Sequence, residues 1–202
     1  TVRNFLRYVG TGIYATNNMF LHRCIPGFIV QGGGFGVANR NLQTSFLSYR
    51  NMPQFPAVTN EFAVGRKVSN TFGTIAMAKV SGNPNSATSQ WFFNLGNNAA
   101  NLDGQNGGFT VFGNVVRGTN VLTMFNAPDV YFGQILNLTT FYGSGAAAFT
   151  DLPVLYSGPT PPYYSDLLYV DISVLNVRVT KTASGREIRW TSVAGKPNVV
   201  EY

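Results

Sequence analysis

The sequence predicts a mainly β fold, an antiparallel barrel or sandwich, and three observations support this prediction. The 202 residues suffice for one hydrophobic core. Helical spacing of apolar residues is confined to two short stretches, residues 2–9 and 119–125. Elsewhere, short segments rich in Val, Ile, Phe and Tyr alternate with clusters of Gly, Asn and Pro, as they do in antiparallel sheets. These segments are residues 19–25, 28–31, 57–62, 73–78, 90–95 and 109–116.

The first and the last regular elements of the first 130 residues are expected to be helices. Apolar residues recur at helical spacing over residues 2–9, and Gly10 favours the end of this helix. A second helix is expected over residues 119–125, with Pro128 as its stop.

The remaining third of the chain has a different composition. Residues 129–165 are rich in Gly, Pro and Tyr and are expected to form a long insertion folded over the surface. Residues 168–179 alternate as a strand. We expect residues 1–180 to form one domain, and residues 181–202 to be a polar C-terminal extension, either a hairpin or a mobile tail.

Composition excludes several classes of function. The 14 basic and 8 acidic residues give a net charge of +6, but Lys and Arg are scattered singly, whereas nucleic-acid binders cluster them. One Cys and one His exclude an internal disulfide and a Cys/His zinc site. Gly32-Gly33-Gly34 lacks the Lys-Ser/Thr of a phosphate loop. No apolar run reaches the roughly 18 residues of a membrane span. We therefore expect no nucleic-acid partner, metal, cofactor or membrane span.

One arginine and one glutamine stand in the otherwise apolar stretch FLHRCIPGFIVQGGGF. Pro26-Gly27 suits the centre of a type II turn and is expected to close a hairpin. Alternation then brings Arg23 and Gln31 together on one face. The amide would orient the guanidinium without neutralising it, and a cation in apolar surroundings stabilises a developing partial charge strongly. The alternative is an arginine whose stem covers apolar neighbours on a sheet surface.

Two neighbours of Arg23 are expected to be buried. Cys24 lies in an apolar run and is interpreted as a small buried hydrophobe. His22 alternates with Arg23 and is expected to point inward, in a structural role.

The segment SATSQWFFN is a second informative stretch. Alternation places Gln90 and Phe92 on one face of a strand, and Trp91 and Phe93 on the other. Without further information such a row of aromatic residues indicates a core rather than a ligand pocket.

Four segments follow one another along the chain: “FLHRCIPGFIVQGGGF”, “NEFAVGRKVSNTFGTIAMAK”, “SATSQWFFN” and “GFTVFGNVVRGTNVL”. In this order they resemble the cyclophilins, the peptidyl-prolyl cis-trans isomerases, and the bacterial branch in particular. The resemblance covers residues 1–126 and the late segment 168–179. It implies a closed eight-stranded antiparallel β-barrel capped by two helices. It also implies an enzyme that catalyses rotation about X-Pro bonds and assists folding, without a cofactor.

The resemblance also implies a role for individual residues. Arg23 aligns with the catalytic arginine and Gln31 with the glutamine that braces it. Gln90 aligns with a contact to the substrate backbone, and Ala78 with a main-chain contact, so that Lys79 need not act through its side chain. The pocket for the proline ring falls on Phe28, Ile29, Phe92, Leu102 and Phe109.

The chain departs from the family pattern at three places. Asn101 replaces a tryptophan that contributes to cyclosporin binding, so we expect weak affinity for cyclosporin. Phe109 stands where many members have a histidine. The strand that precedes the first helix in the family is expected in sequence before Thr1, or residues 186–193 would take its place.

The expected partners are proline-containing peptides and unfolded or folding proteins. Two alternatives are a scaffold module that keeps the barrel without catalysis, and a carbohydrate-binding β-domain suggested by the Asn and Tyr content. Low charge, abundant Asn and the basic balance favour a periplasmic or secreted protein, with a cytoplasmic location as the alternative.

Overall fold

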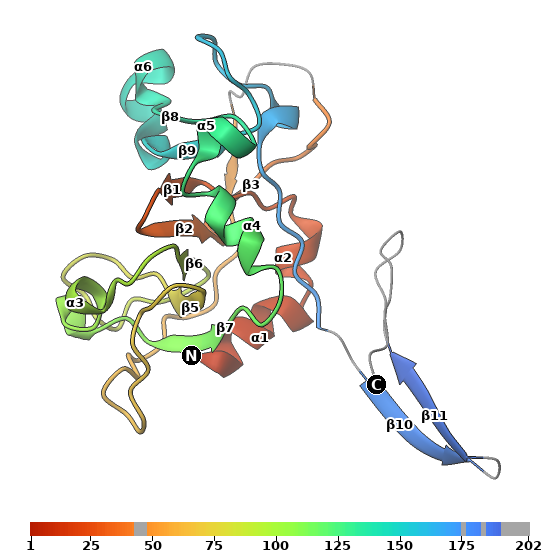
Figure 1. The fold of residues 1–202 in the computed structure, drawn as a ribbon. Coiled ribbons are helices and arrows are strands. Elements are labelled where there is room, and N and C mark those ends of the chain that lie inside the picture. Colours follow the sequence, from red (N-terminus) through yellow and green to blue (C-terminus); the bar gives the residue numbers. More distant parts are fainter. Residues whose placement is uncertain (43–47, 175–176, 183–184, 191–202) are drawn as a thin grey trace. The chain divides into compact units, whose positions relative to one another are not determined.

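The structure is a computed structural model that describes residues 1–42, 48–174, 177–182 and 185–190 (Figure 1). It divides into two units, residues 1–172 and 173–202, which are described separately. The first unit contains a five-stranded antiparallel sheet. In spatial order its strands are β1 (Arg23–Ile25), β2 (Ile29–Gly32), β6 (Trp91–Asn94), β5 (Thr74–Met77) and β7 (Val111–Asn114).

Four of these strands lie inside predicted segments, β2 extends one residue beyond the segment 28–31, and the predicted mainly β fold is confirmed. The hairpin of β1 and β2 has the predicted register, with Arg23 opposite Gln31. Gly27 closes it with a φ of 73°, a conformation that glycine adopts without strain. The segment 57–62 is not a strand, and that prediction was wrong: its one recorded strand-like contact is an isolated bridge between Val58 and Ala87.

Short helices cover the main sheet and connect its strands. Helix α1 (Val2–Gly10) matches the prediction, and α2 (Ile13–Thr16), which was not predicted, follows it. Helix α4 (Thr119–Met124) is confirmed. Pro128 begins a further helix, α5 (Pro128–Tyr131), because a proline is tolerated in the first turn. Two short elements follow β6, α3 (Ala99–Leu102) and η1 (Gln105–Gly107).

The main core lies between these first helices and the sheet. Trp91, Tyr8 and Tyr14 are completely or almost completely buried in it. The Tyr14 hydroxyl donates to the Ser89 carbonyl, so its burial leaves no hydroxyl unsatisfied. Trp91 and Phe93 face this core, whereas Phe92 belongs to a separate small cluster. The two faces of β6 therefore differ as alternation predicted.

Residues 129–165 form a lobe around a second hydrophobic cluster, which includes Phe149, Leu152 and Val154 at 0% exposure and is shared with Phe20 and Val37. Figure 1 shows this lobe next to β1. Its elements are β8 (Gln134–Leu136), α6 (Thr139–Tyr142), η2 (Gly143–Phe149), β9 (Leu152–Val154) and η3 (Tyr164–Asp166). A short pair, β3 (Phe35–Gly36) and β4 (Arg50–Asn51), completes the unit.

The predicted single strand over residues 168–179 was wrong. Residues 168–170 do run beside residues 19–21, with Leu21 N donating to Leu168 O and Val170 N to Met19 O, both at 2.9 Å. Regular strand begins again at β10 (Val177–Thr182), which pairs with β11 (Gly185–Trp190) in the second unit. A hairpin is therefore present, and it starts before residue 181. Residues 191–202, and with them part of the segment 186–193, lie outside the described residues.

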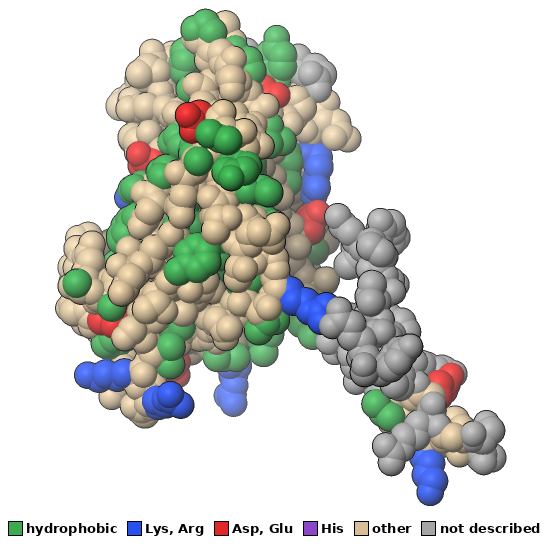
Figure 2. Space-filling view, viewed as in Figure 1, with side chains coloured by type: hydrophobic (Ala, Val, Ile, Leu, Met, Phe, Trp, Pro, Cys, Tyr) green, Lys and Arg blue, Asp and Glu red, His purple; other side chains and the backbone are tan. Residues whose placement is uncertain are grey.

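The surface reflects the low charge of the sequence. On the face of the first unit drawn in Figure 2, uncharged polar atoms and backbone predominate, and charged side chains are few and dispersed. Among the residues that the structure describes, none of the helices has the length and apolar character needed to cross a membrane.

Candidate functional site

A cavity of about 620 Å³ opens over β2 and β6. All nine site residues named from the sequence line it: Arg23, Phe28, Ile29, Gln31, Ala78, Gln90, Phe92, Leu102 and Phe109. The structure adds seven further lining residues: His22, Phe35, Lys79, Ser81, Asn101, Gln105 and Ala148.

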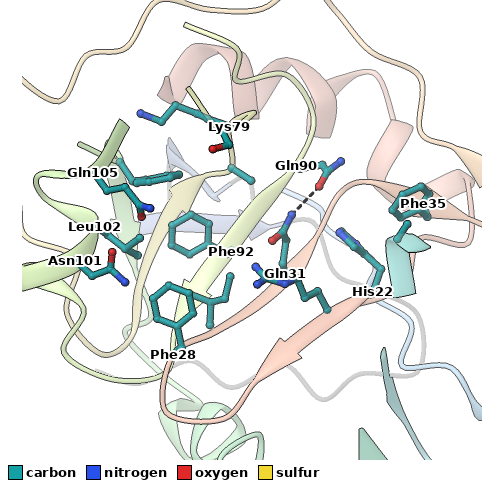
Figure 3. Close-up of a pocket in the computed structure, with 16 residues that line it drawn as sticks. His22, Phe28, Gln31, Phe35, Lys79, Gln90, Phe92, Asn101, Leu102 and Gln105 are labelled. Carbon is teal, nitrogen blue, oxygen red and sulfur yellow. Dashed lines mark hydrogen bonds between the residues drawn. The ribbon is translucent and has the colours of Figure 1, made fainter. Parts of the chain in front are cut away.

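One half of the cavity is an apolar hollow (Figure 3). Phe92 forms its floor at 2% exposure, next to Ile29 and Leu102, which are also buried. Phe28 and Phe109 are partly exposed around it. The Phe109 ring meets Phe92 edge to face, with centroids 5.7 Å apart. Aromatic and aliphatic walls of this kind suit a small apolar ring.

Hydrogen bonds of the backbone and of asparagine hold the hollow in shape. Asn98 Nδ2 donates to the Phe28 carbonyl at 2.7 Å, and its own carbonyl accepts from Leu102 N at 2.8 Å. Phe109 N donates to the Leu102 carbonyl at 2.9 Å. One asparagine therefore links the turn of the first hairpin to the helix that carries Leu102.

Lys79 supports the loop before Phe109 through its side chain. Its Nζ donates to the carbonyls of Asn106 and Gly108 at 2.8 and 2.7 Å and lies 4.5 Å from the Phe109 ring centroid. Burial lowers the pKa of this ammonium. The sequence indicated no side-chain role for Lys79, because the loop that it contacts is distant along the chain.

The other half of the cavity is polar. Gln31 Nε2 donates to Gln90 Oε1 at 2.7 Å, the dashed bond in Figure 3. Arg23 lies opposite Gln31 in the register, but its recorded ion pair is with Asp151, at 3.5 Å from Nε to Oδ2. Sequence reasoning did not foresee a carboxylate beside this guanidinium. That Gln31 orients Arg23 stays a prediction.

His22 is buried, as predicted, at 3% exposure. Its ring nevertheless reaches the cavity, where it hydrogen-bonds to the Gln90 side chain and meets Phe35 edge to face at 4.9 Å. The absence of a side chain at Gly34 leaves space for the His22 ring and the Gln90 side chain, since an added Cβ there would lie 3.0 Å from both. Burial lowers the pKa of His22 to about 4, Arg23 also lowers it, and the bond to Gln90 opposes them. The imidazole is therefore neutral at pH 7.

The Ala78 main chain can offer a peptide its carbonyl but not its N–H. Ala78 N donates to the Gln90 carbonyl at 2.9 Å, so its carbonyl is the group left to contact a peptide.

Cys24 is 1% exposed, and burial raises the pKa of its thiol to about 12. This agrees with a buried hydrophobe and excludes a thiolate nucleophile near neutral pH.

Asp151 and Ala148 reach the site from the insertion, and sequence reasoning missed both. A possible signal for Asp151 was its position as the single charged residue in the stretch GAAAFTDLPVL. The motif that located Arg23 ends long before this stretch, so it gave no indication of the pairing.

The site thus combines an apolar hollow with a guanidinium and two linked amides. In the described part of the chain, no group of three or more His, Cys, Asp or Glu could hold a metal ion. The arrangement suits the binding of a peptide and the stabilisation of partial charge on it.

Comparison with known proteins agrees with this geometry. The sequence model described as cyclophilin type peptidyl-prolyl cis-trans isomerase/CLD matches residues 1–135. A peptidyl-prolyl cis-trans isomerase of Acinetobacter baylyi is 36% identical over 140 residues, which cover 68% of this chain and 66% of that protein. Peptidyl-prolyl cis-trans isomerase A of Dickeya dadantii is 43% identical, over 60% of this chain and 56% of that protein. Peptidyl-prolyl cis-trans isomerase B of Escherichia coli is 40% identical, over 60% of this chain and 68% of that protein.

The chain therefore spans between about half and two thirds of the length of the relatives that it matches. The match includes every site residue named from the sequence and ends before Ala148 and Asp151. The chain belongs to the family of cyclophilin-type peptidyl-prolyl cis-trans isomerases.

Proposed function

We propose that the cavity catalyses cis-trans isomerisation of X-Pro bonds in peptides and in unfolded or folding proteins. The observation that carries this proposal is that Arg23 lines the same cavity as the buried Phe92 hollow. A proline ring has the size and apolar character for the hollow, and the guanidinium stands beside it.

The reaction breaks no covalent bond, so it needs neither a nucleophile nor an acid/base pair. Amide resonance gives X-Pro rotation a barrier of about 18–20 kcal/mol. In the twisted transition state the prolyl nitrogen loses conjugation and becomes a better hydrogen-bond acceptor. Donors of Arg23 directed at this nitrogen, or at the neighbouring carbonyl, stabilise the twisted state more than either planar state, and this difference accelerates the reaction.

The other site residues hold the substrate on both sides of the rotating bond. Phe28, Ile29, Phe92, Leu102 and Phe109 would bury the proline ring. The Gln90 side chain and the Ala78 carbonyl would bind the adjoining main chain. The ring then stays fixed while the residue before it rotates.

Two finer properties are part of the proposal. We expect weak cyclosporin affinity, because the cavity wall has Asn101 where a tryptophan would add an apolar face. Inhibition by cyclosporin at low concentration would contradict this.

We also propose that the sheet belongs to a closed eight-stranded barrel. Residues 19–21 and 168–170 support this, because they are two further segments, outside the five strands, that pair through backbone hydrogen bonds. An experimental structure with fewer barrel strands would contradict it.

The test is the variant Arg23→Ala, assayed by protease-coupled hydrolysis of a short X-Pro peptide. We expect kcat/KM to fall by roughly 100-fold or more, as when one preorganised donor is removed from an oxyanion site. Arg66→Ala is the control, because Arg66 is exposed and does not line the cavity. Circular dichroism would establish that both variants fold. An unchanged rate in folded Arg23→Ala would contradict the proposal and favour a scaffold function.

A further inference from the structure

The insertion contributes to the site from beyond the part of the chain that matches the family. Asp151 follows η2 and immediately precedes β9, whereas the family match ends at residue 135. Ala148 of the same stretch lines the cavity. The insertion is thus a wall of the site as well as a surface lobe.

Buried contacts on three sides fix the position of Asp151. Cys24 N, in the residue after Arg23, donates to the Asp151 carbonyl at 2.7 Å. Cys24 itself is 1% exposed. Phe149 and Leu152, on either side of Asp151 in the sequence, are both at 0% exposure in the core of the lobe. The carboxylate therefore projects toward Arg23 from a fixed backbone.

The ion pair engages the Nε side of the guanidinium, at 3.5 Å from Asp151 Oδ2. A guanidinium has five N–H donors, so a carboxylate at Nε leaves donors of the terminal nitrogens for a substrate. Gln31, the other polar neighbour of Arg23, gives its amide to Gln90. Asp151 is therefore the group whose recorded contact restrains the guanidinium.

We propose that Asp151 is a positioning residue for Arg23: the insertion supplies the carboxylate that holds the guanidinium in its catalytic orientation. This inference depends on the proposed isomerase function. It assigns to the segment after residue 135 a part in catalysis as well as in packing.

The experiment measures kcat and KM separately for Asp151→Ala and Asp151→Asn on an X-Pro peptide. The backbone bond from Cys24 remains in both variants, so the lobe should stay in place. We expect Asp151→Ala to lower kcat about fivefold with KM unchanged, which corresponds to about 1 kcal/mol and suits an ion pair partly exposed to solvent. Asp151→Asn should lower kcat by less than Asp151→Ala, because its side chain keeps a polar oxygen near Arg23 but carries no charge.

The control is Asp129→Ala, which removes an exposed negative charge from the same insertion and should leave kcat unchanged. An increase in kcat in Asp151→Asn would overturn the proposal, because it would mean that Asp151 neutralises Arg23 rather than positions it. Equal losses in Asp151→Ala and Asp129→Ala would also overturn it, because they would indicate a general effect of charge.

A spectroscopic measurement separates this inference from the proposed function. The ¹H–¹⁵N signal of the Arg23 side-chain Nε, assigned by its loss in Arg23→Lys, should shift in Asp151→Ala and not in Asp129→Ala. If the intact chain has no isomerase activity, the proposed function fails, and this signal still reports whether Asp151 holds Arg23. If activity is present and the signal does not move, the positioning role is wrong.

Discussion

The neutral imidazole of His22 connects the cavity with the interior of the protein. It hydrogen-bonds to Gln90, which accepts from Gln31, so three side chains form one chain of contacts. Its Nδ1 has no hydrogen-bond partner among the described residues. Protonating this ring would place a charge in a buried site next to a guanidinium, which explains the low pKa.

His22 should therefore make stability depend on pH. Its pKa is about 4 in the folded protein and about 6.5 in the unfolded chain. The unfolded state binds the extra proton first, so stability is full above about pH 6.5 and decreases as the pH falls toward 4. Between about pH 7.5 and pH 5 the free energy of unfolding should fall by about 2 kcal/mol, before most carboxylates titrate.

Urea unfolding of the protein and of His22→Gln at these two pH values measures the difference. The variant should have lost most of the pH dependence. The same dependence in both proteins would show that another group causes it.

At this scale the sequence located residues well where they follow a local motif. Alternation and the Pro26-Gly27 turn sufficed to bring Arg23 opposite Gln31 and to separate Phe92 from Trp91. Asp151 could not be found in this way, because its position depends on how a distant lobe packs against β1.

The strands of this protein begin and end where their backbone groups have hydrogen-bond partners in a neighbouring segment. Segment 57–62 resembles a strand in composition, but its recorded bridge is a single one to Ala87. Residues 168–179 alternate throughout, yet the described residues 168–174 contain no regular strand, and β10 begins at Val177, where β11 provides hydrogen bonds. Side-chain patterns indicate which residues can form strands. They do not show over which residues a neighbouring strand is present to pair with them.

The turn between β1 and β2 provides a test of element formation. Gly27 has a φ of 73°, and an added Cβ would meet nothing within 4 Å, so backbone conformation alone sets the cost of a side chain. Gly27→Ala should lower the free energy of unfolding by about 1–2 kcal/mol. Urea denaturation measures this change.

Gly10→Ala is the matched control for this substitution. Gly10 also has open space around it, but it lies in α1, where alanine is favoured. This variant should gain up to about 1 kcal/mol. Equal effects at the two glycines would contradict the role given to the turn.

The whole molecule combines a family domain with an added lobe. The first unit, residues 1–172, contains the family match, the cavity and the insertion, and the β10–β11 hairpin belongs to the second. The ordered motifs predicted the family and the location of the cavity. The core of the insertion was not predicted, because no motif covered residues 129–165 and their Gly, Pro and Tyr content indicated only a surface segment.

The central claim is that this chain catalyses cis-trans isomerisation of X-Pro bonds by holding the proline ring over Phe92 beside Arg23. The most direct test is NMR exchange spectroscopy of a short peptide with one X-Pro bond, with a catalytic amount of the intact chain added. Uncatalysed exchange takes tens to hundreds of seconds. We predict that the folded chain brings the exchange rate into the range where cis and trans signals show cross-peaks, and that Arg23→Ala does not. Exchange that stays at the uncatalysed rate in the presence of the folded chain would contradict the account.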